Sequence, residues 1–130
     1  AHTAPLGLRF YDGQLFPEAV RGDLFVALHG SWNRSVPVGY KLIRIPFAGG
    51  VAGQAEDFAT GWMANEGDRG SVWGRPVDVL VAPDGVLWVT TSNADQVTLG
   101  GAYTRPVDDR ILRIELTGGP GPAAPSTSNT

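Results

Sequence analysis

Cysteine is absent from this 130-residue chain, and histidine occurs only twice. Without cysteine the chain has no disulfide, no thiolate metal ligand and no cysteine nucleophile. With two imidazoles a zinc site would depend on carboxylates, and none stand at ligand spacing. The sequence also has no Gly-x-Ser-x-Gly elbow and no glycine-rich phosphate-binding pattern. We therefore expect no metal site and no hydrolase or nucleotide site of these types.

The chain also lacks a basic excess and a long apolar run. The net charge is −3 and the pI is near 5.2, so nucleic acid is not an expected partner. No apolar run approaches the roughly 18 residues of a membrane-spanning helix, so we expect no membrane span. The first residues, AHTAPLG, have neither the charged nor the apolar part of a signal peptide. A cytosolic chain and one that has lost its leader both remain open on these residues.

Glycine and proline, in contrast, are plentiful, with 18 and 10 residues spread between short apolar runs. No stretch has the i, i+3, i+4, i+7 apolar spacing of an amphipathic helix. We predict an all-β chain of antiparallel strands, with at most one helical turn after Pro17. The expected strands are 6–11, 23–28, 40–47, 56–58, 77–82, 87–91 and 110–116. Residues 117–130 have almost nothing to bury and predict a disordered tail.

Two parts of the chain follow the same order of elements: an Asp-Gly turn, an apolar strand and a strand containing Arg-Ile. Leu24 corresponds to Leu87 at an offset of 63, and Ile45 corresponds to Ile114 at an offset of 69. Repeats of short antiparallel strands are typical of β-propeller blades. We therefore predict a domain over 1–116 with one blade in about 1–70 and a second in about 71–116. Two unrelated meanders are the alternative.

Two blades alone would leave exposed sheet edges, because propellers typically close about four to eight blades into a ring. We therefore expect either a fragment of a longer protein or a unit that assembles with other chains. The sequence begins in the middle of the pattern, which favours the fragment.

Polar side chains gather where two predicted strands meet loops. The loop after strand 23–28 reads HGSWNR and contains His29, Ser31, Trp32, Asn33 and Arg34. Loops at strand ends commonly present binding groups, although a polar loop with a core-capping Trp is an equally ordinary structure. In Trp73-Gly74-Arg75-Pro76, a guanidinium on a stiff turn is suited to bind a carboxylate. A structural ion pair between Arg75 and Asp78 or another nearby acid is the alternative.

Carboxylates give weaker signals. Asp108 and Asp109, with Asn93 and Asp95, offer calcium ligands, but the EF-hand spacing is absent and acidic loops are commonly just solvated. No pair of carboxylates stands out as a glycosidase site.

The segments APLGLRFYDG, RGDLFVALHGSWNR, GYKLIRIPF, WGRPVDVLVAPDGVLWVTTSN and DDRILRI together resemble a known family. They are similar to the C-terminal part of the soluble sugar dehydrogenases that depend on pyrroloquinoline quinone, the glucose/sorbosone dehydrogenase family. The resemblance runs from about Ala4 to Leu116 and implies two blades of a six-bladed β-propeller. Family members are periplasmic or secreted. They oxidise sugars or polyols with the quinone, a calcium ion and a histidine base.

The resemblance implies which residues of this chain contact the cofactor. They are Arg75, His29, Arg34, Trp32 and His2. Arg75 matches the first arginine of the family's Arg-x-Arg-Asp-Val pattern, whereas Val77 stands at the second. The catalytic histidine and the calcium-binding backbone fall upstream, so no catalytic or metal-binding residue is expected in this chain. The isolated chain is then expected not to oxidise sugar. The alternative is a non-catalytic binding module that assembles with other chains and recognises its partner through HGSWNR.

Overall fold

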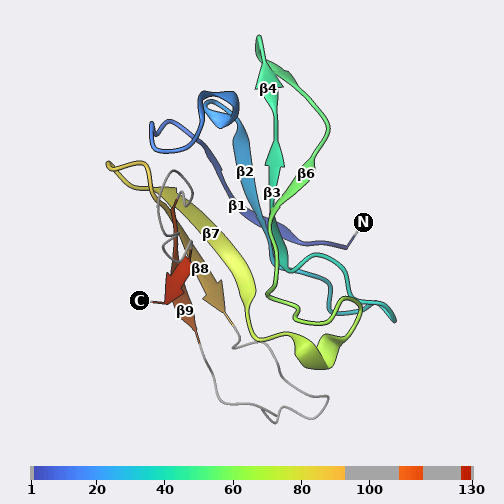
Figure 1. Cartoon of the computed structure of the whole chain (residues 1–130). Helices are drawn as coiled ribbons and strands as arrows, with labels where there is room; N and C mark the ends of the chain where they lie inside the picture. The colour runs from blue at the N-terminus through green and yellow to red at the C-terminus, as the bar shows by residue number, and fades with distance from the viewer. Residues whose placement is uncertain (1, 93–108, 116–126, 130) are drawn as a thin grey trace.

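The computed structural model describes residues 2–92, 109–115 and 127–129 (Figure 1). Within these ranges the chain is all-β, and its only helical segments are two 3-10 turns, η1 (Glu18–Val20) and η2 (Arg69–Ser71). The prediction of an all-β chain is confirmed for these residues. The helical turn expected after Pro17 is η1, which begins at the next residue.

Two four-stranded antiparallel sheets form the structure (Figure 1). The first has the order β1-β2-β3-β6, with β1 (Pro5–Phe10), β2 (Leu24–Leu28), β3 (Lys41–Ile45) and β6 (Glu56–Ala59). The second has the order β10-β9-β8-β7, with β7 (Arg75–Val81), β8 (Leu87–Ser92), β9 (Arg110–Ile114) and β10 (Thr127–Asn129). A short hairpin joins β4 (Phe47–Ala48) to β5 (Val51–Ala52). Each sheet is a meander in which strands consecutive along the chain are neighbours, apart from this hairpin.

The turn η2 and the strand β5 were not predicted from the sequence. Two of the predictions that were made also differ from the structure. The strand expected over 40–47 is interrupted at Pro46, which has no N–H to donate to a strand ladder, so β3 and β4 are separate. Residues 127–129, placed in the tail by composition, form β10 and pair with β9. Strand pairing uses backbone groups and needs no apolar side chain, so composition gave no signal for it. The rest of the predicted tail lies outside the described residues.

The repeat predicted from the sequence is reproduced by the strand register. Leu24 pairs with Ile45 between β2 and β3, and Leu87 pairs with Ile114 between β8 and β9. These are the two corresponding pairs at offsets of 63 and 69. β2 and β3 therefore pair in the same register as β8 and β9.

One hydrophobic core fills the space between the sheets, where β7 packs against β1 and β2 (Figure 1). It contains residues of the first sheet (Phe25, Ala27, Leu42) and of the second (Val79, Leu87, Val89, Leu112, Ile114). The buried Tyr11 hydroxyl donates to the Gly85 carbonyl at 2.7 Å and accepts from the Phe16 N–H at 3.1 Å. The two predicted units therefore share a core, and a buried hydrogen bond joins them at one end.

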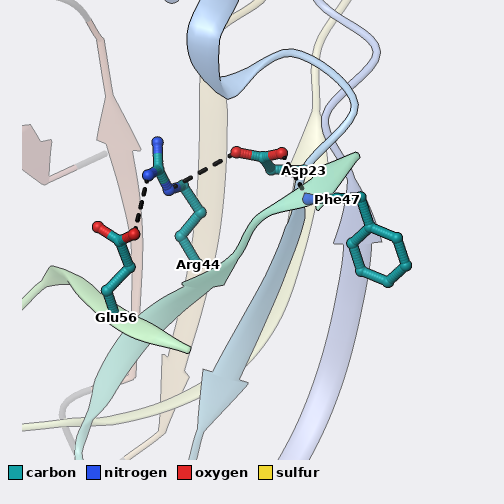
Figure 2. Close-up of polar contacts among 4 residues, drawn as sticks. All are labelled: Asp23, Arg44, Phe47 and Glu56. Atoms are coloured by element: carbon teal, nitrogen blue, oxygen red, sulfur yellow. Dashed lines mark hydrogen bonds and ion pairs between the residues drawn. The ribbon is translucent and has the colours of Figure 1, made fainter. Parts of the chain in front are cut away.

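A line of charged side chains crosses the first sheet at that same end (Figure 2). Asp23, the first residue of the strand expected over 23–28, directly precedes β2 and is 3% exposed. Its Oδ1 accepts from the Phe47 N–H at 3.0 Å, and its Oδ2 lies 3.6 Å from Arg44 Nε. Arg44 Nη2 in turn lies 3.0 Å from Glu56 Oε1. Asp23 thus anchors the turn from β3 into β4, while Arg44 links it to β6.

Candidate functional site

The opposite end of the two sheets holds the residues that the sequence singled out. There β2 finishes, while β1 and β7 begin. The His29 N–H donates to the Ala4 carbonyl at 2.9 Å, and the Gly30 N–H donates to the Thr3 carbonyl at 2.8 Å. These bonds extend the β1–β2 pairing past the strand ends. The start of the chain is thereby fixed beside the HGSWNR loop.

Arg75, the first residue of β7, lies across the gap between the sheets. Its Nε donates to the His29 carbonyl at 2.9 Å, and its Nη2 donates to the Gly30 carbonyl at 2.6 Å. The side chain is 4% exposed, and its guanidinium carbon lies 5.5 Å above the centre of the Tyr40 ring. Charge-assisted hydrogen bonds and a cation–π contact stabilise this buried charge. They also fasten the second sheet to the loop that follows β2.

The His29 side chain in turn contacts the backbone of β7. Its Nδ1 lies 3.1 Å from the Pro76 carbonyl oxygen. A carbonyl oxygen only accepts, so the proton of this bond belongs to Nδ1, and in neutral His29 the ring lone pair lies on Nε2. The imidazole is half-buried and held in orientation by the second sheet. Such a ring can bind an anion when protonated and accept a proton when neutral.

Tyr40 forms the base beneath Arg75, and the sequence analysis did not identify it. It adopts a left-handed backbone conformation with φ of 59°, uncommon for a residue with a side chain. Its hydroxyl donates to the Ser31 carbonyl, and its ring lies so close to Gly30 that a Cβ there would approach to 2.6 Å. A glycine in HGSWNR is therefore required by the Tyr40 ring. Gly39, which precedes Tyr40 at φ of 95°, was the available signal of a tight turn.

The rest of the loop is braced through its backbone. Ser31 and Val38 exchange two hydrogen bonds, from the Ser31 N–H to the Val38 carbonyl at 2.9 Å and from the Val38 N–H to Ser31 Oγ at 3.0 Å. From η2, Arg69 donates through Nη1 to the Trp32 carbonyl and through Nη2 to the Arg34 carbonyl, both at 2.9 Å. The loop tip is therefore held in shape although its side chains are exposed. Arg69 is a second residue that the sequence analysis missed.

All five predicted cofactor contacts come from segments at this end. The described contacts join His29 and Arg75 directly. Trp32 and Arg34 lie at the exposed loop tip, three and five residues beyond His29, and their backbone carbonyls accept hydrogen bonds from Arg69. His2 is exposed and precedes Thr3, whose carbonyl accepts from Gly30. The structure therefore groups these residues at one rim, with Arg75 buried beneath it.

The described residues contain neither a cluster of metal ligands nor a membrane-spanning helix. No group of three or more His, Asp or Glu residues is placed to hold a metal ion. Of the calcium candidates only Asp109 is described, and residues 93, 95 and 108 lie outside those ranges. No helix in the described part is long and apolar enough to cross a membrane.

The site is thus a cationic, aromatic rim at one end of a two-sheet all-β structure. The chain belongs to the TrAA12-like family, whose model matches residues 1–99. It is 38% identical over 99 residues to an uncharacterized protein of Borreliella burgdorferi, covering 75% of this chain and 25% of that protein. It is 31% identical over 122 residues to a pyrroloquinoline quinone-dependent pyranose dehydrogenase of Coprinopsis cinerea, covering 82% of this chain and 16% of that enzyme. The chain spans a quarter or less of the length of these relatives. No solved structure is significantly similar to it.

Proposed function

We propose that this chain is part of a quinone-dependent sugar oxidoreductase of the glucose/sorbosone dehydrogenase type and forms one wall of the quinone pocket. The observation that carries the proposal is the reciprocal contact of Arg75 and His29 beneath an exposed rim. The similarity to a pyrroloquinoline quinone-dependent pyranose dehydrogenase supports the same cofactor. The substrate is a sugar or polyol. The compartment in this proposal is the periplasm or the exterior of the cell.

The donor set fits the cofactor. Pyrroloquinoline quinone is a flat aromatic tricarboxylate, which calls for cations and a planar apolar surface. Arg34 and His29 would bind carboxylate, and the Trp32 indole would lie along the rim together with His2. Arg75 keeps the His29 and Gly30 carbonyls in place and adds a buried positive charge that attracts an anion. When bound, the quinone supplies the redox chemistry by accepting a hydride from the sugar. Calcium and the proton-accepting histidine belong, in this proposal, to another part of a longer protein.

The sheets are proposed to be two neighbouring blades of a propeller, six-bladed in the full-length family. Leu87 faces the core between the sheets. Its repeat equivalent, Leu24, pairs with the half-exposed Phe10 on the face turned away from the second sheet. A two-fold sandwich would turn equivalent residues inward in both sheets. In this structure Leu24 and Leu87 point in the same direction, since Leu87 faces the first sheet and Leu24 faces away from the second. This is a head-to-tail arrangement, which further sheets can continue.

The outer face of the second sheet supports this arrangement. Leu80 is 54% exposed there, and with Trp88 and Ile111 it lines an open apolar hollow of about 550 Å³. Trp88 is the repeat equivalent of Phe25, which is fully buried between the two sheets. The face exposed on the second sheet is thus the counterpart of the face that the first sheet buries. A further sheet with the Leu24 pattern would fit it.

The experiment is a titration of the chain with pyrroloquinoline quinone, followed by quinone absorbance. We expect saturable binding that weakens when Arg34 and His29 are both changed to Ala. We also expect no glucose oxidation in a dye-linked assay with added quinone and calcium, since the base is proposed to lie elsewhere. No binding by the folded chain would end the pocket-wall proposal. Robust glucose oxidation by these 130 residues would refute the proposal that the catalytic base lies outside them.

A second function is favoured by the exposed apolar outer face of the second sheet. In it the chain is a non-catalytic propeller piece that assembles with other copies or another chain and uses HGSWNR for recognition. Three two-sheet chains would provide six blades. Solution mass separates the two: a stable trimer without quinone binding favours the assembling module.

A further inference from the structure

An exposed indole stands on a braced loop, a combination that a surface loop does not need for folding. Trp32 is 74% exposed, although burying an aromatic ring of this size lowers the free energy of the folded chain. The loop around it is nevertheless fixed, because Ser31 and Val38 close its base with two hydrogen bonds. A large aromatic surface is therefore kept in water in a defined position.

Arg69 provides the bracing nearest the indole. Its two terminal nitrogens each hold one carbonyl, that of Trp32 and that of Arg34, at 2.9 Å. The planar fork of a guanidinium suits this two-point contact, which a lysine cannot reproduce. Fixing the backbone on both sides of residue 33 restricts the direction in which the indole can project. Restricting it before binding lowers the entropy lost when a ligand stacks on it.

We propose that the Trp32 indole is a stacking surface for a pyranose ring, with Arg69 as its positioning residue. This inference rests on the proposed sugar oxidoreductase function and adds to it the residue that contacts the ring face. A pyranose with equatorial hydroxyls has an apolar face of C–H groups that matches an indole, and its hydroxyls project around the edge. The exposed amide of Asn33, next in sequence, supplies both donors and acceptors for such hydroxyls.

The test uses the quinone-free chain and methyl β-glucopyranoside, with affinity measured by saturation-transfer NMR. Sorbitol is the matched ligand, because it carries similar hydroxyls but has no ring face. We expect the glycoside to bind and sorbitol not to bind at the same concentration. Trp32→Ala should lower the glycoside affinity by about tenfold or more, the scale of losing one aromatic stacking partner. Trp32→Phe should retain part of it.

Arg69→Ala should weaken glycoside binding about threefold to tenfold, through lost preorganisation, while the Trp32 side chain is still present. Arg69→Lys should behave nearly like Arg69→Ala, since one ammonium does not bridge both carbonyls. Trp88→Ala, a half-buried tryptophan on the outer face of the second sheet, is the control and should bind as the unchanged chain does. Circular dichroism verifies that each variant is folded.

Equal binding of glycoside and sorbitol, or unchanged affinity in Trp32→Ala, would overturn the inference, as would no binding by the unchanged chain. An unchanged affinity in Arg69→Ala would show that Arg69 does not position the indole for binding. The quinone titration is separate, so a chain that binds quinone but no glycoside loses only this inference. A chain that binds glycoside but no quinone loses the proposed pocket wall.

Discussion

Arg75 begins β7 of the second sheet, His29 directly follows β2 of the first, and the side chain of each binds backbone of the other's segment. The Arg75 Nε donates to the His29 carbonyl at 2.9 Å, and the His29 Nδ1 lies 3.1 Å from the Pro76 carbonyl oxygen. The two residues are 46 positions apart in the sequence. The contact joins the two sheets at the end where the candidate site lies, so the same bonds bear on stability and on the shape of the site.

Replacing Arg75 with Ala should therefore lower the free energy of unfolding by about 3 kcal/mol, because two carbonyls in a buried setting lose their donors. The stability of Arg75→Lys should lie between those of Arg75→Ala and the unchanged chain, since lysine keeps the charge but not the two-point geometry. Denaturant unfolding followed by tryptophan fluorescence measures both. Arg9→Ala, an exposed arginine in β1, should change stability by no more than about 0.5 kcal/mol. If Arg75→Ala matches Arg9→Ala, the tie between the sheets does not stabilise the fold.

The Asp23–Arg44–Glu56 line should be energetically uneven (Figure 2). Asp23 is nearly fully buried and also accepts the Phe47 N–H, whereas Glu56 is exposed. Asp23→Ala should cost about 2–3 kcal/mol, as expected when a buried acceptor is lost and Arg44 loses its partner. Glu56→Ala should cost less than about 1 kcal/mol, because an exposed ion pair is worth little. Equal losses in thermal or denaturant unfolding would contradict this assignment.

Gly7 is expected to tolerate no side chain. A Cβ at Gly7 would lie 2.6 Å from the Asp78 Cα and 2.0 Å from its Oδ1. The carboxylate can rotate away but the backbone atom cannot, so Gly7→Ala should push β1 from β7 and cost about 1–3 kcal/mol. Gly53→Ala is the matched control, since its nearest neighbour would be 3.3 Å away on an exposed turn. A Gly7→Ala chain as stable as Gly53→Ala would mean that the sheets separate there without loss.

The sequence predicted the strands well because turn residues stand at the ends of the apolar runs. All seven expected strands are present, and the two corresponding pairs, Leu24 with Ile45 and Leu87 with Ile114, are both in register. Local pattern determines such elements. The pairing of residues 127–129 depends on an open strand edge of β9, which no local pattern reveals.

The candidate site was predicted only as a set of residue types. Arg75 and His29 were selected at strand ends, but their contact depends on how two sheets pack, which spacing does not show. Tyr40 was read as the start of an apolar strand, and its role beneath Arg75 follows from a left-handed backbone angle. Arg69 lies 37 residues from Trp32, so its bonds to the loop were equally hidden. Whether the five predicted residues bind the quinone stays a prediction.

The outer face of the second sheet should make the isolated chain associate. Leu80 and Ile111 are large, exposed and adjacent to one hollow. Sedimentation velocity should show concentration-dependent association of the unchanged chain and a monomer for the Leu80→Glu, Ile111→Lys double variant. Val51→Glu replaces a still more exposed apolar residue in the β4–β5 hairpin and should associate as the unchanged chain does. Identical sedimentation of all three would argue against a further sheet docking on this face.

Val77 gives the sharpest test of the quinone proposal. The family resemblance places a second arginine there, and the strand register shifts between Pro76 and Asp78, around this residue. Such bulges redirect side chains near binding sites. If the quinone binds this rim, Val77→Arg adds a charge-assisted partner for a carboxylate and should tighten binding by about tenfold.

The measurement is the absorbance titration with pyrroloquinoline quinone at two salt concentrations, since a new ion pair should weaken as salt rises. Thr90→Arg adds the same charge on the outer face of the second sheet and serves as the control. A general gain from one more positive charge would appear in both variants. Tighter binding confined to Val77→Arg places the carboxylates beside the start of β7, whereas equal affinities in the two variants would remove the quinone from this end of the sheets.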